Sequence, residues 1–223
     1  MCGRFVLSSP ASVIAEEFHV DQYSLDLQPS YNVAPSQQIV IVRKEGVNKL
    51  AKCGWGFLPS WAKDPVEGRR MINARAETVA DKPAFRAAFR DNRCLVVADG
   101  FFEWRKKGAK KTPLYIRLRS GMAFGLAGLY SVWTSPEGEK VCTCTIITTE
   151  ANELLEPVHD RMPVIIPKDK HDLWLDPAEK DRDRLLALLR PYDPLEMEAF
   201  QVSSKVNLPS YNAADVIEPE GLV

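Results

Sequence analysis

The chain has 223 residues, of which 45% are hydrophobic and 26% charged, and its 29 Lys and Arg against 30 Asp and Glu give a formal net charge of −1. These ordinary globular values exclude a disordered chain, a collagen-like repeat and a coiled coil. No apolar run reaches the roughly 18 residues of a membrane helix and no secretory signal is visible, so we expect a cytoplasmic protein with no membrane partner.

Short strands with a few helices between them are predicted along the chain, without an internal repeat or a low-complexity linker. Ser9 and Pro10 are typical of the N-cap and the first position of a helix. The predicted helices span 11–18, 82–90, 152–155, 170–175 and 178–189. The predicted strands span 37–43, 49–55, 94–98, 99–104, 114–118, 123–132, 142–148 and 164–166. Many antiparallel strands with peripheral helices indicate a single α+β domain.

Charge is distributed unevenly along the sequence. Residues 69–119 contain 14 Lys and Arg against 5 Asp and Glu, whereas residues 150–223 contain 8 against 16. The basic block includes a predicted hairpin whose loop, 106–111, carries four lysines. Such a block favours a polyanion as partner, and a solvated basic face is the alternative that charge alone leaves open.

Five cysteines without a signal peptide do not indicate a disulfide framework. They stand at positions 2, 53, 94, 142 and 144. The last four lie among apolar residues, where a free cysteine acts as a small hydrophobe. Cys142 and Cys144 lack the two-residue spacer of zinc knuckles and the three histidines are scattered, so we expect neither a metal nor another cofactor.

Cys2 is different because removal of Met1 would leave it with both a free α-amine and a thiol. An α-amine has a pKa of about 7.7–8.0, against about 10.4 for lysine, so it is far more often neutral at pH 7. A 1,2-aminothiol condenses with an aldehyde to an imine, and the thiol then closes a five-membered thiazolidine. Alternatively, the amine can act as base for its own thiol in amide hydrolysis, or the cysteine stands there by chance.

Two further segments carry candidate catalytic groups. Asn73, Arg75 and Glu77 alternate, so an extended backbone would point all three side chains to one side. Glu103 follows a strongly apolar run, where burial would raise its pKa and suit it to acid or base catalysis. An exposed hairpin carboxylate is the alternative for Glu103.

Two more segments combine polar groups with a constrained backbone. His159 and Arg161 place an imidazole and a guanidinium two residues apart, although a hydrogen-bonded loop histidine would look the same. Asn32 precedes Val-Ala-Pro35, a pattern that turn chemistry alone also explains.

Six motifs in this order closely resemble the SOS response-associated peptidase (SRAP) family. They are Met-Cys-Gly-Arg-Phe, Tyr-Asn-Val-Ala-Pro, Trp-Gly-Phe-Leu-Pro-Ser-Trp, Ile-Asn-Ala-Arg-Ala-Glu-Thr, Ala-Asp-Gly-Phe-Phe-Glu-Trp and His-Asp-Arg-Met-Pro. The resemblance implies one SRAP domain over 1–223, with a core over 2–207, a C-terminal tail over 208–223 and a mainly antiparallel, barrel-like core.

The resemblance also implies a role for each matching residue. Cys2 matches the residue that crosslinks to the ring-opened abasic sugar, and Asn73 matches the asparagine that orients the amine and the sugar. Glu103 matches the acid/base glutamate, and His159 the histidine associated with ring opening and reversal. The residues expected to contact DNA are Arg4, Asn32, Pro35, Trp61, Arg75, Thr149 and Arg161.

The function implied is that of a sensor of abasic sites in single-stranded DNA, which forms a covalent thiazolidine crosslink after Met1 is removed. We expect the word peptidase in the family name to refer to this removal of Met1 by the protein itself. Lyase activity at the abasic site is a further expectation. The partner would be single-stranded DNA, and the protein a nucleoid-associated monomer. Two alternatives remain: an N-terminal-nucleophile hydrolase resembling glutamine amidotransferases, and a non-covalent single-strand binder.

Overall fold

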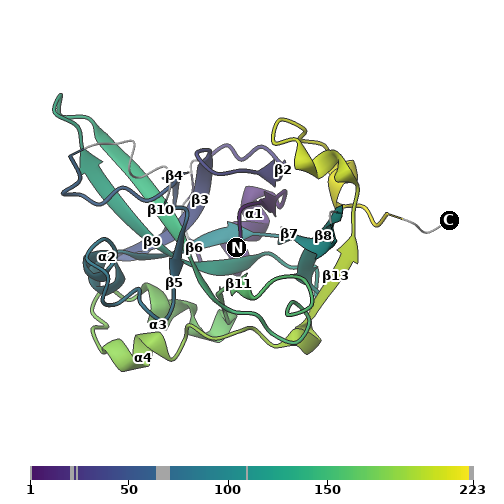
Figure 1. Ribbon diagram of the computed structural model, residues 1–223. Helices are drawn as coiled ribbons and strands as arrows, with labels where there is room; N and C mark the ends of the chain where they lie inside the picture. Colours follow the sequence, from purple (N-terminus) through teal and green to yellow (C-terminus); the bar gives the residue numbers. More distant parts are fainter. Residues whose placement is uncertain (1, 21–22, 24, 64–70, 109, 221–223) are drawn as a thin grey trace.

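A closed barrel of five strands forms the centre of the computed structural model, which describes residues 2–20, 23, 25–63, 71–108 and 110–220 (Figure 1). The order of neighbouring strands around the ring is β10-β4-β3-β6-β9, and β9 pairs with β10 to close it. The barrel strands are β3 (Gln38–Glu45), β4 (Val47–Trp55), β6 (Arg93–Ala98), β9 (Phe124–Thr134) and β10 (Lys140–Glu150). The predicted α+β class with a barrel-like, mainly antiparallel core is confirmed.

The interior of the barrel explains the apolar run of β6. All six residues of this strand are buried, and it pairs with β9 along its whole length. A Cβ atom at Gly125 or Gly128 would lie 2.9 Å from the side chain of Leu95 or from Sγ of Cys94. The two glycines of β9 therefore leave the space that side chains from β6 fill, which packs the barrel as a solid core.

A second sheet continues directly from the barrel, because the chain passes from β6 into β7 through Asp99. Its strands, in the order β13-β8-β7-β1-β2, are β13 (Met197–Gln201), β8 (Lys110–Leu118), β7 (Gly100–Lys107), β1 (Phe5–Leu7) and β2 (Ser30–Val33). The Asp99 carboxylate accepts the backbone N–H groups of Ser8 and Ser9 and the Ser9 hydroxyl, the last at 2.6 Å. These bonds fix β1 beside the junction between the two sheets.

The same bonds correct the predicted start of the first helix. Pro10, not Ser9, is the N-cap, since Ser9 is held by Asp99, and the helix α1 spans Ala11–Glu17. The other helices, α2 (Arg86–Asp91), α3 (His171–Leu175) and α4 (Arg182–Leu186), gather on one side of the barrel in Figure 1.

Three predicted helices differ from the structure. The segment 152–155 is a turn in which Oδ1 of Asn152 accepts the N–H of Leu155, so local side-chain bonding replaces a helix. Asp181 caps α4 by accepting the N–H groups of Asp183 and Arg184, which starts the helix at Arg182 instead of residue 178. The helix predicted over 82–90 begins only at Arg86, after a series of turns.

Three short strands extend the barrel sheet at the edge where the candidate residues lie. They are β5 (Asn73–Arg75), β11 (Arg161–Pro163) and β12 (Ile165–Ile166). β5 runs parallel to β10, and β11 runs antiparallel to it, with Thr149 opposite Met162. The 71–77 and 158–163 motifs are therefore brought onto the same strand, β10.

The segment after residue 207 packs against the second sheet. Short 3-10 turns, η4 (Ser204–Asn207) and η5 (Ala214–Ile217), cover a small cluster in which Val216 is buried with Val6, Phe102 and Tyr115. Val202 forms an isolated bridge with Pro219. Two further 3-10 turns are η2 (Lys168–Lys170) and η3 (Pro194–Glu196). The division into a 2–207 core and a 208–223 tail stays a prediction, and residues 221–223 lie outside the described part.

A disulfide joins Cys53 of β4 to Cys142 of β10, with Cα atoms 4.8 Å apart. The expectation that these two cysteines are free is therefore wrong. The reason is the parallel pairing of β4 with β10, which sets Thr143 opposite Gly54 and brings together residues 89 positions apart in the sequence. Cys2, Cys94 and Cys144 are free and buried.

Candidate functional site

Cys2 lies completely buried directly before β1, at 0% exposure. Asn73 of β5 holds its backbone, since Nδ2 donates to the Cys2 carbonyl oxygen at 2.8 Å. Oδ1 of the same amide is buried without a hydrogen-bond partner among the described residues. Burial and the nearby Glu103 carboxylate raise the pKa of the Cys2 thiol to about 12. The thiol is therefore protonated at neutral pH.

Glu103 comes from β7 and is 4% exposed, opposite Leu114 of β8. It lines a cavity of about 410 Å³ together with His159 and with Trp104, Lys106, Lys111 and Asn207. Residues from the barrel edge and from the second sheet thus meet around one space. Of the alternatives for Glu103, the exposed hairpin carboxylate is excluded by this burial.

His159 is half-buried, and its ring is oriented by the adjoining backbone. Nδ1 accepts the N–H of Arg161 at 2.9 Å and lies 2.8 Å from Oδ1 of the exposed Asp160. The ring also lines the cavity of about 410 Å³, where it can exchange a hydrogen bond with a bound group.

Arg161 and Arg75 occupy strands that both pair with β10, but they differ in their partners. Arg161 forms a two-pronged ion pair with Glu77 and also donates to the carbonyl oxygen of Thr148 at 2.6 Å. This pairing lowers the pKa of Glu77. Arg75 is exposed, and no ion pair of its side chain occurs in the described part of the chain. It is therefore the more accessible cation for a phosphate.

Arg4 and Asn32 form a buried clasp between the start and the end of the chain. Arg4 donates to Oδ1 of Asn32 at 2.7 Å and to the carbonyl oxygen of Val206 at 2.8 Å. Nδ2 of Asn32 donates to the carbonyl oxygens of Leu208 and Tyr211. The geometry gives Asn32, at 1% exposure, a structural role; direct contact of Arg4 or Asn32 with DNA stays a prediction.

The remaining predicted DNA contacts lie in different settings. Pro35 is half-buried in the turn after β2, and Trp61 is 63% exposed. Thr149 is buried in β10, opposite Met162 of β11. Part of the loop that carries Trp61, residues 64–70, lies outside the described residues. A contact of these three residues with DNA stays a prediction.

Two residues near the site escaped the sequence analysis as functional candidates. Trp104 and Asn207 line the same cavity as Glu103, and Nε1 of Trp104 donates to Oδ1 of Asn207 at 2.7 Å. The guanidinium of Arg4 lies over the Trp104 ring, 5.9 Å from its centroid. Trp104 follows Glu103 in the Ala-Asp-Gly-Phe-Phe-Glu-Trp motif, and this position could have identified it as a candidate. Asn207 lies in no such motif, so no sequence signal pointed to it.

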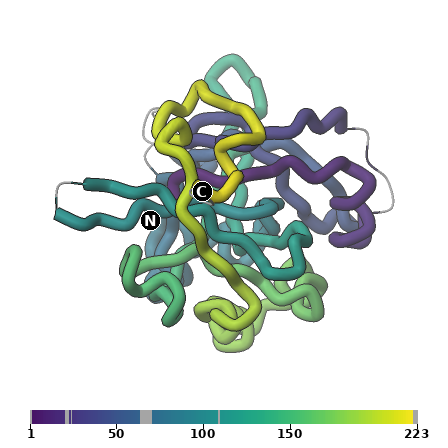
Figure 2. The backbone as a smooth tube through the Cα atoms, turned by 90° about the vertical axis from the view of Figure 1, so that its right-hand side faces the viewer, coloured from purple at the N-terminus to yellow at the C-terminus, as the bar shows by residue number. Residues whose placement is uncertain are grey.

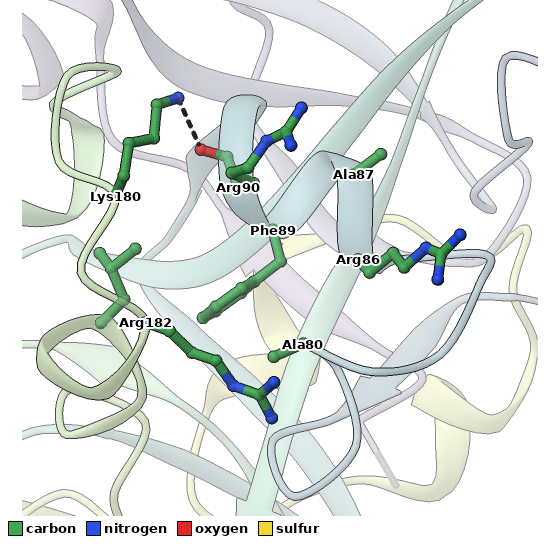
Figure 3. Close-up of a pocket in the computed structure, with 8 residues that line it drawn as sticks. Ala80, Arg86, Ala87, Phe89, Arg90, Lys180 and Arg182 are labelled. Carbon is green, nitrogen blue, oxygen red and sulfur yellow. Dashed lines mark hydrogen bonds between the residues drawn. The ribbon is translucent and has the colours of Figure 1, made fainter.

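A separate cavity of about 310 Å³ lies between α2 and the start of α4, and Phe89 points into it (Figure 3). None of the predicted site residues lines it. Three of its four cations are paired within the protein: Asp91 binds Arg90 and Lys180, and Asp81 binds Arg182. The chemistry of the 410 Å³ cavity around Glu103 and His159 is therefore the better candidate for function.

The described residues offer neither a metal centre nor a helix that could span a membrane. Within 2–20, 23, 25–63, 71–108 and 110–220, no group of three or more His, Cys, Asp or Glu is arranged to hold a metal ion. No helix in the same part of the chain is long and apolar enough to cross a bilayer.

The fold combines a closed barrel with a second sheet. Its buried cysteine is held by an asparagine and lies near a glutamate. A model of the SOS response associated peptidase (SRAP) family matches residues 1–209, and the chain belongs to this family.

Individual relatives extend the similarity over nearly the whole chain. The abasic site processing protein YoqW of Bacillus subtilis is 50% identical over 222 residues, covering 98% of this chain and 99% of YoqW. The abasic site processing protein YedK of Escherichia coli is 30% identical over 181 residues, covering 78% and 79% of the two chains. A solved structure of a protein from Bacteroides thetaiotaomicron is 29% identical, with a TM-score of 0.90 over 98% of this chain and 99% of that one.

Proposed function

We propose that this protein processes abasic sites in single-stranded DNA by forming a covalent thiazolidine crosslink through Cys2, after Met1 has been removed. The observation that carries the proposal is the convergence of three groups: Asn73 holds the Cys2 backbone, and the Glu103 carboxylate lies close enough to raise the pKa of its thiol. The names of relatives such as YoqW and YedK support the same substrate.

The chemistry proceeds in balanced steps. Hydrolysis of the Met1–Cys2 amide consumes one water and frees the α-amine. The amine attacks the aldehyde carbon of the ring-opened sugar, and the carbinolamine loses water to give an imine. The Cys2 sulfur then bonds to the imine carbon and closes the thiazolidine ring. The thiol proton is transferred to the nitrogen.

Each proton transfer has a candidate group in the site. Because burial keeps the thiol protonated, ring closure needs a base beside Cys2, and the Glu103 carboxylate is that base. Loss of water from the carbinolamine needs an acid, a role for the same carboxyl group once protonated. His159, which lines the same cavity as Glu103, is suited to help open the closed sugar. The same imine is the intermediate from which lyase activity would follow.

The raised pKa also bears on the hydrolase alternative. With a pKa raised to about 12, the Cys2 thiol is protonated in nearly all molecules at neutral pH. A glutamine amidotransferase depends on an activated thiol nucleophile, whereas imine formation begins at the amine. The site therefore favours the aldehyde over an amide as the substrate. Partnership with single-stranded DNA as a monomer, and association with the nucleoid, complete the proposal.

The test is to incubate the purified protein with single-stranded DNA that carries one abasic site, and to run a denaturing gel. We expect a heat-stable shifted band with the wild type and none with Cys2→Ala. Cys94→Ala is the matched control, because Cys94 is also free and buried but lies in the barrel, and it should keep the band.

Three results would contradict the proposal. They are a wild-type protein with Met1 removed that gives no band, a band that persists in Cys2→Ala, and a band of equal intensity on undamaged DNA. Release of ammonia from glutamine without a band would establish the hydrolase alternative. Mass spectrometry of the N-terminus shows in each case whether Met1 has been removed.

A further inference from the structure

The hairpin formed by β7 and β8 extends beyond the sheet that carries it. β1 pairs with β7 only at Gly100 and Phe101, and β13 pairs with β8 only from Leu114 onward. Pro113 still accepts the backbone N–H of Val202, so the two strands pair with each other alone from Arg105 and Thr112 onward. Figure 2 shows this part as a projecting arm. It was predicted as a basic loop, but it continues as paired strands to Lys107 and Lys110.

The arm carries positive charge in an arrangement that weakens the isolated hairpin. Lys106 lies directly opposite Lys111, and Lys107 directly opposite Lys110. Like charges in cross-strand pairs are destabilising. These four lysines and Arg105 are exposed, and no ion pair of theirs occurs within the described residues. No Asp or Glu occurs in the sequence between Glu103 and Glu137.

The base of the arm opens into the candidate site. Lys106 and Lys111 line the cavity of about 410 Å³ that also contains Glu103 and His159, and Trp104 forms part of its wall. Two cations, an aromatic ring and the proposed catalytic groups thus share a space of the size that small ligands occupy. The arm and the side chains of Glu103 and His159 therefore border the same cavity.

We infer that the arm is a second binding site for the DNA strand, in which Lys106 and Lys111 hold a phosphate next to the abasic residue and Lys107 and Lys110 follow the backbone further along. This inference rests on the proposed function and adds to it the segment of DNA that the arm holds. A bound phosphodiester backbone places negative charges beside both lysine pairs. These charges offset the repulsion between the paired lysines. A phosphate also fits the cavity, whereas an acidic protein partner would have no reason to reach Glu103.

The experiment compares three double variants with the wild type. Lys106→Gln/Lys111→Gln changes the base of the arm, and Lys107→Gln/Lys110→Gln changes its tip. Lys44→Gln/Lys49→Gln is the control, since it removes the same charge from the β3–β4 hairpin. Fluorescence anisotropy gives the affinity for undamaged single-stranded DNA at several salt concentrations, and single-turnover gels give the crosslinking rate at saturating abasic DNA.

Both arm variants should bind DNA roughly tenfold more weakly at low salt, with a salt slope flatter by about 1.4 for two lost phosphate contacts. The control should keep the wild-type crosslinking rate at saturation, and the Tm of the arm variants without DNA should stay equal or rise because the repulsion is gone. The control should bind as the wild type does.

Wild-type affinity in both arm variants would overturn the inference, as would an equal loss in the control. Loss of binding to polyglutamate with unchanged DNA binding would assign the arm to an acidic protein instead. The proposed function fails separately: a wild type without any adduct, combined with arm variants that bind DNA weakly, refutes the crosslink and supports the arm.

Discussion

At the scale of single residues, Cys2 and Glu103 control each other's chemistry. Burial is the main cause of the raised thiol pKa and the Glu103 carboxylate the second, so neutralising Glu103 lowers the pKa of Cys2. A lower pKa alone would favour attack by sulfur. Under the proposed mechanism the amine attacks first and Glu103 transfers protons afterward. Removing the charge of Glu103 therefore has two opposing effects: it lowers the pKa of the thiol, and it removes the group that transfers the protons.

Glu103→Gln distinguishes these effects. We expect the crosslinking rate at saturating DNA to fall about 100-fold or more, since loss of a positioned acid or base outweighs the small gain in thiolate. More Met1 should also remain attached. Single-turnover gels and mass spectrometry measure the two quantities, with the exposed Glu137→Gln as control. Unchanged kinetics would remove Glu103 from the mechanism.

At the scale of elements, the edge strands β5 and β11 bring their motifs together by pairing with β10. The alternation of Asn73 and Arg75 predicted an extended segment, and the strand confirms it. The position of this strand beside β10 depends on pairing between residues distant in the sequence. The ion pair of Arg161 with Glu77 likewise joins residues 84 positions apart. The sequence pattern carries no information on such a register.

Arg75→Ala tests the exposed cation of this edge. We expect weaker binding to single-stranded DNA and a salt slope flatter by about 0.7, because one phosphate contact is lost. The Tm should change little, since the side chain has no ion partner among the described residues. Arg161→Ala is the comparison, and it should also raise the pKa of Glu77 toward its ordinary value. An unchanged slope in Arg75→Ala would exclude a phosphate contact.

At the scale of the whole molecule, the sequence predicts the parts of the fold that are local. The β3–β4 hairpin, the buried strand β6 and the β7–β8 hairpin follow from turn residues and apolar runs. The short strands β1, β2 and β13 were not predicted, because they are set by partners distant in the sequence. The Cys53–Cys142 disulfide and the Arg4–Asn32 clasp were not predicted for the same reason, because each joins residues that are distant in the sequence.

Ending the chain at Asn207 tests whether the following segment belongs to the core. Truncation there removes Val216 from the second cluster and removes the carbonyl acceptors of Asn32 at Leu208 and Tyr211. Burial of one valine contributes about 1.5–3 kcal/mol, so we expect the Tm to fall by about 5–15 °C. Differential scanning calorimetry measures it, with a chain ending at Glu220 as control. An unchanged Tm would establish 208–223 as a dispensable tail.

The clasp between Arg4 and the carbonyl oxygen of Val206 spans 202 positions of the sequence. A ribosome releases the N-terminal end first, so Cys2 emerges long before Val206 and Asn207. The cavity lined by Glu103, His159 and Asn207 is completed only when almost the whole chain has been synthesised. The order of translation therefore delays the reactive site: a nascent chain carries the cysteine, but without the clasp its surroundings are incomplete until synthesis is nearly finished.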